Sequence, residues 1–516
     1  MKTSANFPRN VAQTAVLMAI LTLISKCFGF IRETVMAGFF GAGYITDSYV
    51  MAQSIPAILF GGVFAAVSTA YMPLFSDIVE NKGNKEGDMF TSRIINILLV
   101  LSFFASIFGF IFSGQIVTIL AGGFDAQRAE LTSFFLKITF LYTLFSSIAS
   151  IIDAYLQYRG IFLTQIIAGY ALNIMAILTI VFSAYTSHYF LAFGMLLGQA
   201  FRFVILFFVA KRKKFLYSRS IELTRTIKNV LTLAIPVFIS SSIQQINSFV
   251  DKMLASNLVV GSVSALYYAM LLITLITSLT TSIFSTIIYP KLAQANSLGN
   301  TNKISEIADR GISLIIIICV PFSLGILVYG KQVVEIIYER GAFDEVASQM
   351  TGTAFIFYGI GLVFLAINEF LLRVYYSIKD MKRPMYFAMT GVLINIILNL
   401  VLVRYMQHNG LALATSLAFF ANTLLLSIGL QLKYKELVIY KSKMKILKIL
   451  LASVCAVAVS FFVYTLSTQY VIGFIFANVL QLFIAVVIAA IVYLALLWVL
   501  KIDEIHFIKN ILKNGE

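Results

Sequence analysis

The chain has 516 residues, of which 60% are hydrophobic and only 12% are charged, and its mean hydropathy is +0.93. Soluble domains carry about 25% charged residues, so this composition excludes a soluble globular protein and indicates a polytopic membrane protein. The net charge of +15 would suit a nucleic-acid partner, but basic loops on one side of a membrane explain it better, and we expect no nucleic acid.

Apolar segments long enough to span a bilayer recur from end to end and predict an all-α fold with about fourteen transmembrane helices. The first apolar run has no small-residue cleavage site and leads directly to Lys26 and Arg32, so it is predicted to be a span rather than a signal peptide. The predicted spans are residues 12–38, 46–75, 91–116, 130–156, 162–184, 188–210, 229–256, 262–290, 311–330, 352–377, 385–405, 410–432, 446–466 and 471–500.

Lysine and arginine are unevenly distributed between these spans. With the N-terminus inside, the inner segments carry roughly 28 of them, whereas the outer segments carry only Arg128, Lys331, Arg340 and Arg404. This bias predicts that both termini lie in the cytoplasm and that the number of spans is even.

An internal repeat divides the chain. GGFD at 122–125 returns as GAFD at 341–344, and this offset covers six helices, so the two halves repeat one topology about an axis along the membrane normal. The predicted parts are an N-terminal six-helix lobe (1–210), a basic cytoplasmic linker (211–228), a C-terminal six-helix lobe (229–432) related to the first by a pseudo-twofold, two accessory transmembrane helices (446–500) and a cytoplasmic tail (501–516).

The first span carries charges at a depth where each costs several kcal/mol on insertion scales. On a helix, Lys26 and Glu33 share a face, Arg32 flanks that face, and Asp47 follows a glycine-rich turn. A cationic stripe opening onto a cavity would bind an anionic cargo. The alternative is that Arg32 and Glu33 extend to an interface or pair with neighbouring helices.

The seventh span begins the second repeat with a polar face. Gln244, Asn247 and Asp251 fall on one side of the helix, and a carboxylate among amides suits sodium or proton coupling. The alternative is an ion pair of Asp251 with Lys252 or with the other lobe. Asp380 lies in a turn, where capping of the next helix is the simpler interpretation.

Three other sets of charged residues lie at membrane depth. Glu369 and Arg373 are four residues apart and either neutralise each other or line the cavity. Lys137 either pairs with Asp153 or lines the lumen. Arg202 is expected to extend its charge to the membrane surface.

Motifs for catalysis are absent from the sequence. There is no phosphate-binding loop, no GxSxG, no HExxH and no pair of acids in an extended loop, and the three cysteines and three histidines are scattered. We therefore expect a protein that is not an enzyme and has neither an ATP motor nor a cofactor other than a coupling sodium ion or proton.

The run SKCFGFIRETVMAGFFGAGYITDSYVMAQSIP, followed by AAVSTAYMPLFSD, resembles the N-terminal signature of the lipid II flippase family (MurJ/MviN). That family belongs to the multidrug/oligosaccharidyl-lipid/polysaccharide exporter superfamily. GSVSALYYA, STIIYPKLA and KDMKRP in the second half are similar to other recurring pieces of the family. The resemblance covers essentially the whole chain.

The resemblance implies a V-shaped transporter with fourteen helices in the bacterial inner membrane. It would move lipid II, the undecaprenyl-diphosphate-linked disaccharide-pentapeptide, from the inner to the outer leaflet by alternating access for peptidoglycan synthesis. An ion gradient or the membrane potential would drive it, and the expected partners are the lipid-linked cargo, membrane lipid and cell-wall synthesis proteins.

The resemblance also assigns candidate residues. Lys26 and Arg32 would bind the diphosphate. Asp47, which matches the family's acidic residue after the glycine turn, and Ser264, which matches the serine of the eighth span, would also belong to the substrate-binding site, as would Arg373. In some members a sodium ion has acidic ligands that would correspond to Asp251 and Asp380.

The chain departs from the family at two arginine positions. It has Phe60 and Gly61 in the second span and Leu271 in the eighth, so its cavity is less cationic, and Arg373 or Lys137 would have to replace some charge. Two alternatives therefore stay open: a flippase for another polyprenyl-diphosphate-linked surface polysaccharide unit, and a cation-coupled multidrug exporter, which the cations of the first span disfavour.

Overall fold

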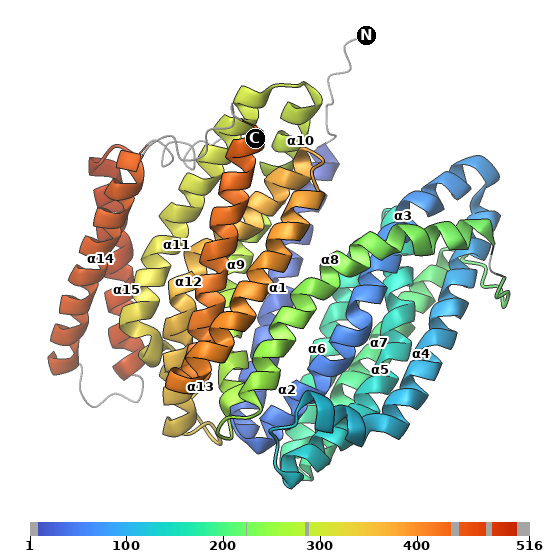
Figure 1. Ribbon diagram of the computed structural model, residues 1–516, viewed down its shortest axis with the longest axis horizontal. Coiled ribbons are helices and arrows are strands. Elements are labelled where there is room, and N and C mark those ends of the chain that lie inside the picture. The colour runs from blue at the N-terminus through green and yellow to red at the C-terminus, as the bar shows by residue number, and fades with distance from the viewer. Residues whose placement is uncertain (1–8, 223, 284–287, 435–442, 471–476, 503–516) are drawn as a thin grey trace. The chain divides into compact units, whose positions relative to one another are not determined.

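The computed structural model of the protein describes residues 9–222, 224–283, 288–434, 443–470 and 477–502, and within them it is helical without strands (Figure 1). In chain order the elements are α1 (Arg9–Phe40), α2 (Tyr44–Pro56), the π-helical turn η1 (Ala57–Gly61), α3 (Gly62–Lys82), α4 (Asn84–Leu120), α5 (Ala126–Tyr158), α6 (Leu163–Tyr185), the 3-10 turn η2 (His188–Phe190), α7 (Leu191–Arg212), α8 (Arg225–Ala255), α9 (Ser262–Ile283), α10 (Tyr289–Ser297), α11 (Thr301–Tyr338), α12 (Glu345–Ser377), α13 (Lys382–Lys433), α14 (Lys443–Tyr470) and α15 (Ala477–Val499).

Each of the fourteen predicted segments overlaps a helix. α2, η1 and α3 together form the second span, and α13 contains two predicted spans on either side of Gln407, whose backbone leaves the helical region (φ 50, ψ −132). Ten helices of the described residues are long and apolar enough to cross a membrane. Parts of two predicted spans, 284–287 and 471–476, lie outside the described residues.

Several helices extend beyond the predicted limits, and α4 and α11 are examples. α4 begins at Asn84 rather than at 91, and α11 begins at Thr301 rather than at 311. The added turns are rich in polar and charged residues, which end a hydropathy window but favour a helix in water. Further along α4, long apolar side chains such as Phe104 and Ile111 are mostly exposed, as is expected of a surface covered by lipid.

The chain divides into two compact units. Unit 1 is Met1–Ser264 with Arg340–Asp344, and unit 2 is Ala265–Glu339 with Glu345–Glu516. The predicted lobe limits rest on the repeat rather than on packing, and they stay a prediction.

Unit 1 is built around paired helices, of which α4 packs on α5, α6 on α7 and α3 on α8 (Figure 1). Its core includes an aromatic stack in which Tyr71 lies between Phe75 and Phe90, with ring centroids 5.1 and 5.7 Å apart. Tyr155 of α5 packs edge-on against Phe75. This stack fixes α3, α4 and α5 to one another.

In unit 2, α12 packs between α11 and α13. The predicted accessory pair, α14 and α15, packs against α11: Tyr329 and Ser460 hydroxyls lie 3.0 Å apart, and the Tyr493 hydroxyl donates to the Ile317 carbonyl at 2.7 Å.

The connection between α7 and α8 is shorter than the predicted linker 211–228, because α7 continues to Arg212 and α8 begins at Arg225. Residues 215–222, called the docked linker below, are hydrogen-bonded along α4. Asp88 and Ser92 accept hydrogen bonds from the backbone N–H groups of Leu216 and Ser218, each at 3.1 Å.

Asn96 completes this row by donating to the carbonyls of Ser218 and Ser220 at 2.9 Å. Asp88, Ser92 and Asn96 are spaced four residues apart, so each lies about 6 Å further along the axis of α4 than the one before it. Two residues of extended chain rise about 6.6 Å, so a helix face and an extended segment can stay in register. The buried ring of Phe215 packs on Tyr155 and joins the docked linker to the core of unit 1.

Candidate functional site

The predicted cation Arg32 is held by contacts within unit 1. Its Nε donates to Glu33 Oε1 at 2.9 Å, and its guanidinium also donates to the Asn173 side chain of α6 at 3.1 Å. Glu33 is buried and Arg32 is half-buried. These contacts match the alternative in which Arg32 pairs with its neighbours, and they fix the position of the guanidinium on α1.

Lys26 lies on the same helix and is exposed. Gly29, between the two cations, faces Asn173, where an added Cβ would be 3.9 Å from the amide oxygen. The face of α1 that carries Gly29 is therefore turned toward α6, and binding of cargo by Lys26 and Arg32 stays a prediction.

The structure brings together Asp47 of α2 and Ser264 of α9, which are 217 residues apart in the sequence. Asp47 is fully buried and accepts hydrogen bonds from the backbone N–H groups of Gly261 and Ser264, each at 2.8 Å, and from the Ser264 hydroxyl. A carboxylate in this place caps the N-terminus of α9, where backbone N–H groups have no partner inside the helix.

Arg128 of α5 lies behind this carboxylate. Its guanidinium is 3.8 Å from Asp47, donates to Asp125 at 3.0 Å and packs over the ring of Phe124 at 4.7 Å. Asp125 caps α5 by accepting from the Arg128 backbone N–H, and this bond together with the Arg128 charge lowers the pKa of Asp125. Arg128 was predicted only as a loop cation, because nothing in the sequence links it to Asp47.

The repeat segment 340–344 belongs to unit 1 and contacts the end of α1. The Ala342 N–H donates to the Gly38 carbonyl at 2.8 Å. Gly41 has φ +64, and a Cβ added to it would lie 2.3 Å from the Ala342 carbonyl oxygen. The backbones therefore approach at a distance that only glycine permits.

Replacing Gly41 with alanine is expected to destabilise unit 1 by about 1–3 kcal/mol, because the new Cβ strains the backbone and overlaps the 340–344 segment. The measurement is the thermal unfolding midpoint of the purified protein. Gly43→Ala is the matched control, since Gly43 has an extended backbone and nothing within 4 Å of an added Cβ. Equal midpoints for the two variants would contradict the close approach.

Of the predicted coupling residues, Asp251 is buried on α8 in unit 1 and has interaction partners, as does Asn247. The side chain of Gln244 lies outside the described residues. No group of three or more His, Cys, Asp or Glu in the described part of the chain is arranged to hold a metal ion.

Asp380 lies in unit 2, in the turn between α12 and α13, so the two predicted coupling acids belong to different units. Lys433 donates to Asp380 at 2.8 Å, and the Arg383 backbone N–H donates at 3.4 Å. Burial acts to raise the pKa of Asp380, but the Lys433 hydrogen bond and the neighbouring charges outweigh it, and the net pKa is lowered. This carboxylate fastens the start of α13 to its end.

Arg373 and Glu369 of α12 are joined through α9 rather than to each other. The Arg373 guanidinium donates to the Thr281 carbonyl at 3.0 Å, and the Thr281 hydroxyl donates to Glu369. Both charged side chains therefore hold the C-terminal part of α9 within unit 2.

The structure corrects the expectation for Arg202 and removes one of the two alternatives left open for Lys137. Asp153 pairs with Arg202 of α7, so Arg202 does not simply extend to the membrane surface, and Lys137 is not the partner of Asp153. Lys137 instead lies over the ring of Phe110, 5.5 Å from its centroid. The sequence carried no signal for this pairing, which depends on how α5 packs against α7.

Two of the positions where the resemblance led us to expect arginine, Phe60 and Gly61, have apolar or open surroundings. Phe60 packs on Phe64 and Phe140, and Gly61 has nothing within 4 Å of an added Cβ.

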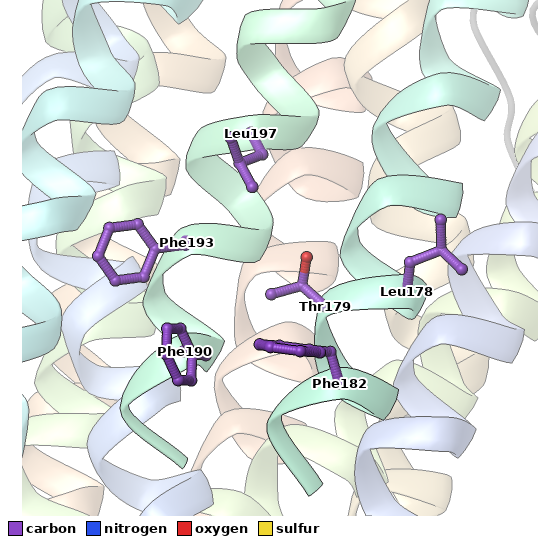
Figure 2. A pocket seen from close by; sticks show the side chains of 6 residues that line it. All are labelled: Leu178, Thr179, Phe182, Phe190, Phe193 and Leu197. Atoms are coloured by element: carbon purple, nitrogen blue, oxygen red, sulfur yellow. The ribbon is translucent and has the colours of Figure 1, made fainter. Parts of the chain in front are cut away.

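An apolar pocket of about 330 Å³ lies between α6 and α7, lined by Leu178, Thr179, Phe182, Phe190, Phe193 and Leu197 (Figure 2). It contains none of the predicted site residues.

Comparison with known proteins identifies relatives over most of the chain. The family model described as lipid II flippase MurJ matches residues 36–481. Lys26 and Arg32 precede this range, whereas Asp47, Asp251, Ser264, Arg373 and Asp380 fall within it.

Similar curated proteins bear the same description. A probable lipid II flippase MurJ of Buchnera aphidicola subsp. Schizaphis graminum is 29% identical over 96% of this chain and 98% of its own length. The lipid II flippase MurJ of Burkholderia cenocepacia is 25% identical over 82% of this chain and 84% of its own length.

Solved structures also match. A lipid II flippase MurJ in an inward closed conformation superposes with a TM-score of 0.80 at 25% identity, covering 95% of this chain and 100% of that one. An inward-facing multidrug resistance MATE transporter gives a TM-score of 0.64 at 12% identity, covering 82% of this chain and 98% of that one, which indicates a shared fold alone.

Proposed function

The chain belongs to the MurJ family of lipid II flippases, and on this basis we propose that it moves lipid II from the inner to the outer leaflet of the bacterial inner membrane by alternating access. The observation that carries the proposal is the family match across residues 36–481. The proposed product is outer-leaflet lipid II, the undecaprenyl-diphosphate-linked precursor of peptidoglycan.

The cargo needs a protein because its head group is charged and strongly hydrated. Moving a diphosphate through hydrocarbon would carry a prohibitive desolvation cost. A cationic surface facing water would hold the diphosphate, while the polyprenyl tail remains in lipid. The protein then has to move only its own helices around the head group.

We assign the first contacts to Lys26 and Arg32. A guanidinium binds phosphate oxygens with two parallel N–H donors, and an ammonium acts as a point charge. Glu33 and Asn173 support this role by fixing the Arg32 side chain on α1. Lys26 is exposed and can follow the cargo with its flexible stem.

Asp47 and Ser264, predicted to bind cargo, are assigned a supporting role. Their hydrogen bonds are made to each other and to the start of α9. The chain passes from unit 1 to unit 2 immediately after Ser264, so making and breaking this cap would change how α9 is held. Arg373 is likewise assigned to holding α9, through Thr281.

The energy for resetting the transporter is proposed to come from the membrane potential or an ion gradient. An elementary charge crossing the membrane is worth about 2.3 kcal/mol per 100 mV, and an inside-negative potential favours outward movement of an anion. Coupling of sodium or protons at Asp251 belongs to this proposal. Asp380 is a weaker candidate because it is already neutralised by Lys433.

The positive-inside bias supports a topology with both termini in the cytoplasm. Cell-wall synthesis proteins that consume the cargo in the outer leaflet are the proposed protein partners.

A second cargo, another polyprenyl-diphosphate-linked surface polysaccharide unit, is favoured by one observation: the chain has Phe60, Gly61 and Leu271 where the family often has arginine. A cationic drug is disfavoured, because Lys26 and Arg32 would repel it.

The test is complementation of a bacterial strain depleted of its own lipid II flippase. Expression of this chain is expected to restore growth and cell shape, because the same diphosphate lipid would again reach the outer leaflet. The second cargo is tested in another strain, one that lacks its polysaccharide flippase. If this chain inserts normally but the lipid II-depleted strain lyses, and if it restores polysaccharide export in the second strain, the cargo is the polysaccharide unit and not lipid II.

A further inference from the structure

The turn that joins the two halves of α13 contains a histidine to which neither the sequence motifs nor the family match gives a role. The turn begins at Gln407, where the backbone leaves the helical region (φ 50, ψ −132). A Cβ added to Gly410 would lie 2.4 Å from the Leu402 carbonyl oxygen, so the two halves of α13 touch through their backbones. His408 lies inside this tight turn, in unit 2, and is only 7% exposed.

His408 attaches the turn to the neighbouring helix α12. Its Nε2 lies 3.2 Å from the Met350 carbonyl oxygen. A carbonyl oxygen only accepts hydrogen bonds, so Nε2 must carry the proton, and Nδ1 of the neutral ring is an acceptor. Nδ1 is buried and has no hydrogen-bond partner among the described residues. The ring is therefore hydrogen-bonded through one nitrogen only.

Protonation of His408 would disturb this contact. The second proton goes to Nδ1, because Nε2 already carries one, and both nitrogens of the charged ring are then donors. A buried charged donor without an acceptor is unfavourable, since it loses its hydration and gains no hydrogen bond. The charged ring regains hydration when it moves away from α12, and that movement breaks the bond to Met350.

The ionisable side chains around the turn do not balance a charge on His408. Those at this end of the packed helices of unit 2 are Lys331, Glu335, Tyr338 and Glu339 at the end of α11, Glu345 of α12, and Arg404 and Tyr405 of α13. The charged ones are exposed except Glu335, which accepts a hydrogen bond from Asn478 at 3.2 Å. Burial lowers the pKa of His408, and the Met350 bond opposes this shift only in part.

We propose that the contact of His408 with α12 is a pH-sensitive switch, which holds the turn of α13 at neutral pH and releases it in acid. In the proposed topology this turn lies on the outer side of the membrane, where the pH follows that of the medium. Release would let the backbone at Gln407 move and would loosen one end of unit 2. The inference does not depend on which lipid the protein transports.

The pH range of the switch follows from the direction of the shift. The ordinary pKa of histidine is about 6.5, and the pKa of His408 in the contact is lower. The neutral ring is favoured in the contact, so the contact is fully present above about pH 6.5. Between that pH and the lowered pKa, each unit of acidification raises the population of the released state by up to about tenfold.

The test is hydrogen–deuterium exchange of the purified full-length protein, measured by mass spectrometry at about pH 7.5 and about pH 5 and corrected for the intrinsic effect of pH on exchange. Peptides that cover residues 401–412 are expected to exchange about tenfold or more faster in acid, because released backbone N–H groups lose protection. Peptides from the core of unit 1, such as residues 148–156 of α5, should exchange equally at both pH values.

His408→Gln removes the titration and keeps a donor. A glutamine amide can donate to the Met350 carbonyl but is not protonated in this pH range. Exchange of residues 401–412 in this variant should therefore be the same at both pH values, whatever its absolute rate. His188→Gln is the matched control, because it removes a histidine of unit 1 and should leave the acid response of the turn unchanged.

Three results would overturn the proposal. An acid response that persists in His408→Gln would show that another group opens the turn. Equal exchange of residues 401–412 at the two pH values in the wild-type protein would show that acid does not break the contact. Faster exchange in acid throughout unit 1 as well would show that the whole protein unfolds rather than this turn.

Discussion

Replacing Asp47 with alanine is expected to destabilise the protein by about 3–5 kcal/mol, the usual cost of removing one partner from a buried charged network, and to abolish transport. Asp47 has no exposed surface, and its carboxylate is the acceptor for the N–H groups of Gly261 and Ser264 and for the Ser264 hydroxyl. Alanine would leave these donors without an acceptor and Arg128 with one acid fewer.

The measurements are the thermal unfolding midpoint of the purified protein and complementation of the depleted strain. Asp47→Asn keeps the size of the side chain but loses its charge and replaces one acceptor oxygen with a donor group, so it should also destabilise. Ser264→Ala removes one donor and should cost only about 1 kcal/mol. The cap would be refuted if Asp47→Ala unfolded at the wild-type midpoint.

A double-mutant cycle isolates the contact itself. Because Asp47 and Ser264 bond directly, the effects of Asp47→Ala and Ser264→Ala should not add. Additive effects would mean that the two residues act independently.

Replacing Arg32 with alanine is expected to abolish complementation while the protein still reaches the membrane. Two causes would act together, since the variant removes a proposed phosphate ligand and also leaves the buried carboxylate of Glu33 without its partner. A buried, uncompensated charge costs several kcal/mol, so the single variant cannot separate binding from folding.

The double variant Arg32→Ala/Glu33→Gln makes that separation. Neutralising Glu33 removes the uncompensated charge, so the double variant should recover the wild-type unfolding midpoint and the wild-type amount in the membrane. If Arg32 binds the cargo, growth should still fail. Restored growth would show that Arg32 serves only to neutralise Glu33, and the cargo-binding role would be withdrawn.

Hydropathy located the membrane spans because long apolar segments have few alternatives in a lipid environment. Hydropathy could not find the bend at Gln407 within α13, because that bend is a change in the backbone of one residue. It also could not find the polar turns by which α4 extends to Asn84, because polar residues end an apolar segment even where the helix continues.

The candidate site was only partly predictable for a related reason. The charges at Lys26, Arg32 and Asp251 stand out against apolar surroundings, so the sequence identifies them. Their partners do not stand out: Asn173 is one of many polar residues. Such contacts depend on helix packing, and a charge pattern along one chain does not encode them.

The same reasoning explains why the partner of Asp153 could not be predicted. Lys137 lies on the same helix as Asp153, and their pairing was one of the two alternatives that the sequence left open for Lys137. The structure pairs Asp153 with Arg202 of the neighbouring helix instead. Partners on adjacent helices compete with partners along one helix, and the packing of α5 on α7 decided the outcome.

The docked linker has a consequence for how this chain can change during evolution. α4 holds it largely through backbone N–H and carbonyl groups, using Asp88, Ser92 and Asn96. Backbone groups are the same for almost every amino acid, so substitutions among the outward-facing residues should be tolerated. Adding or deleting one residue would instead shift every donor away from its acceptor, so natural variation in this connection should alter its composition and preserve its length.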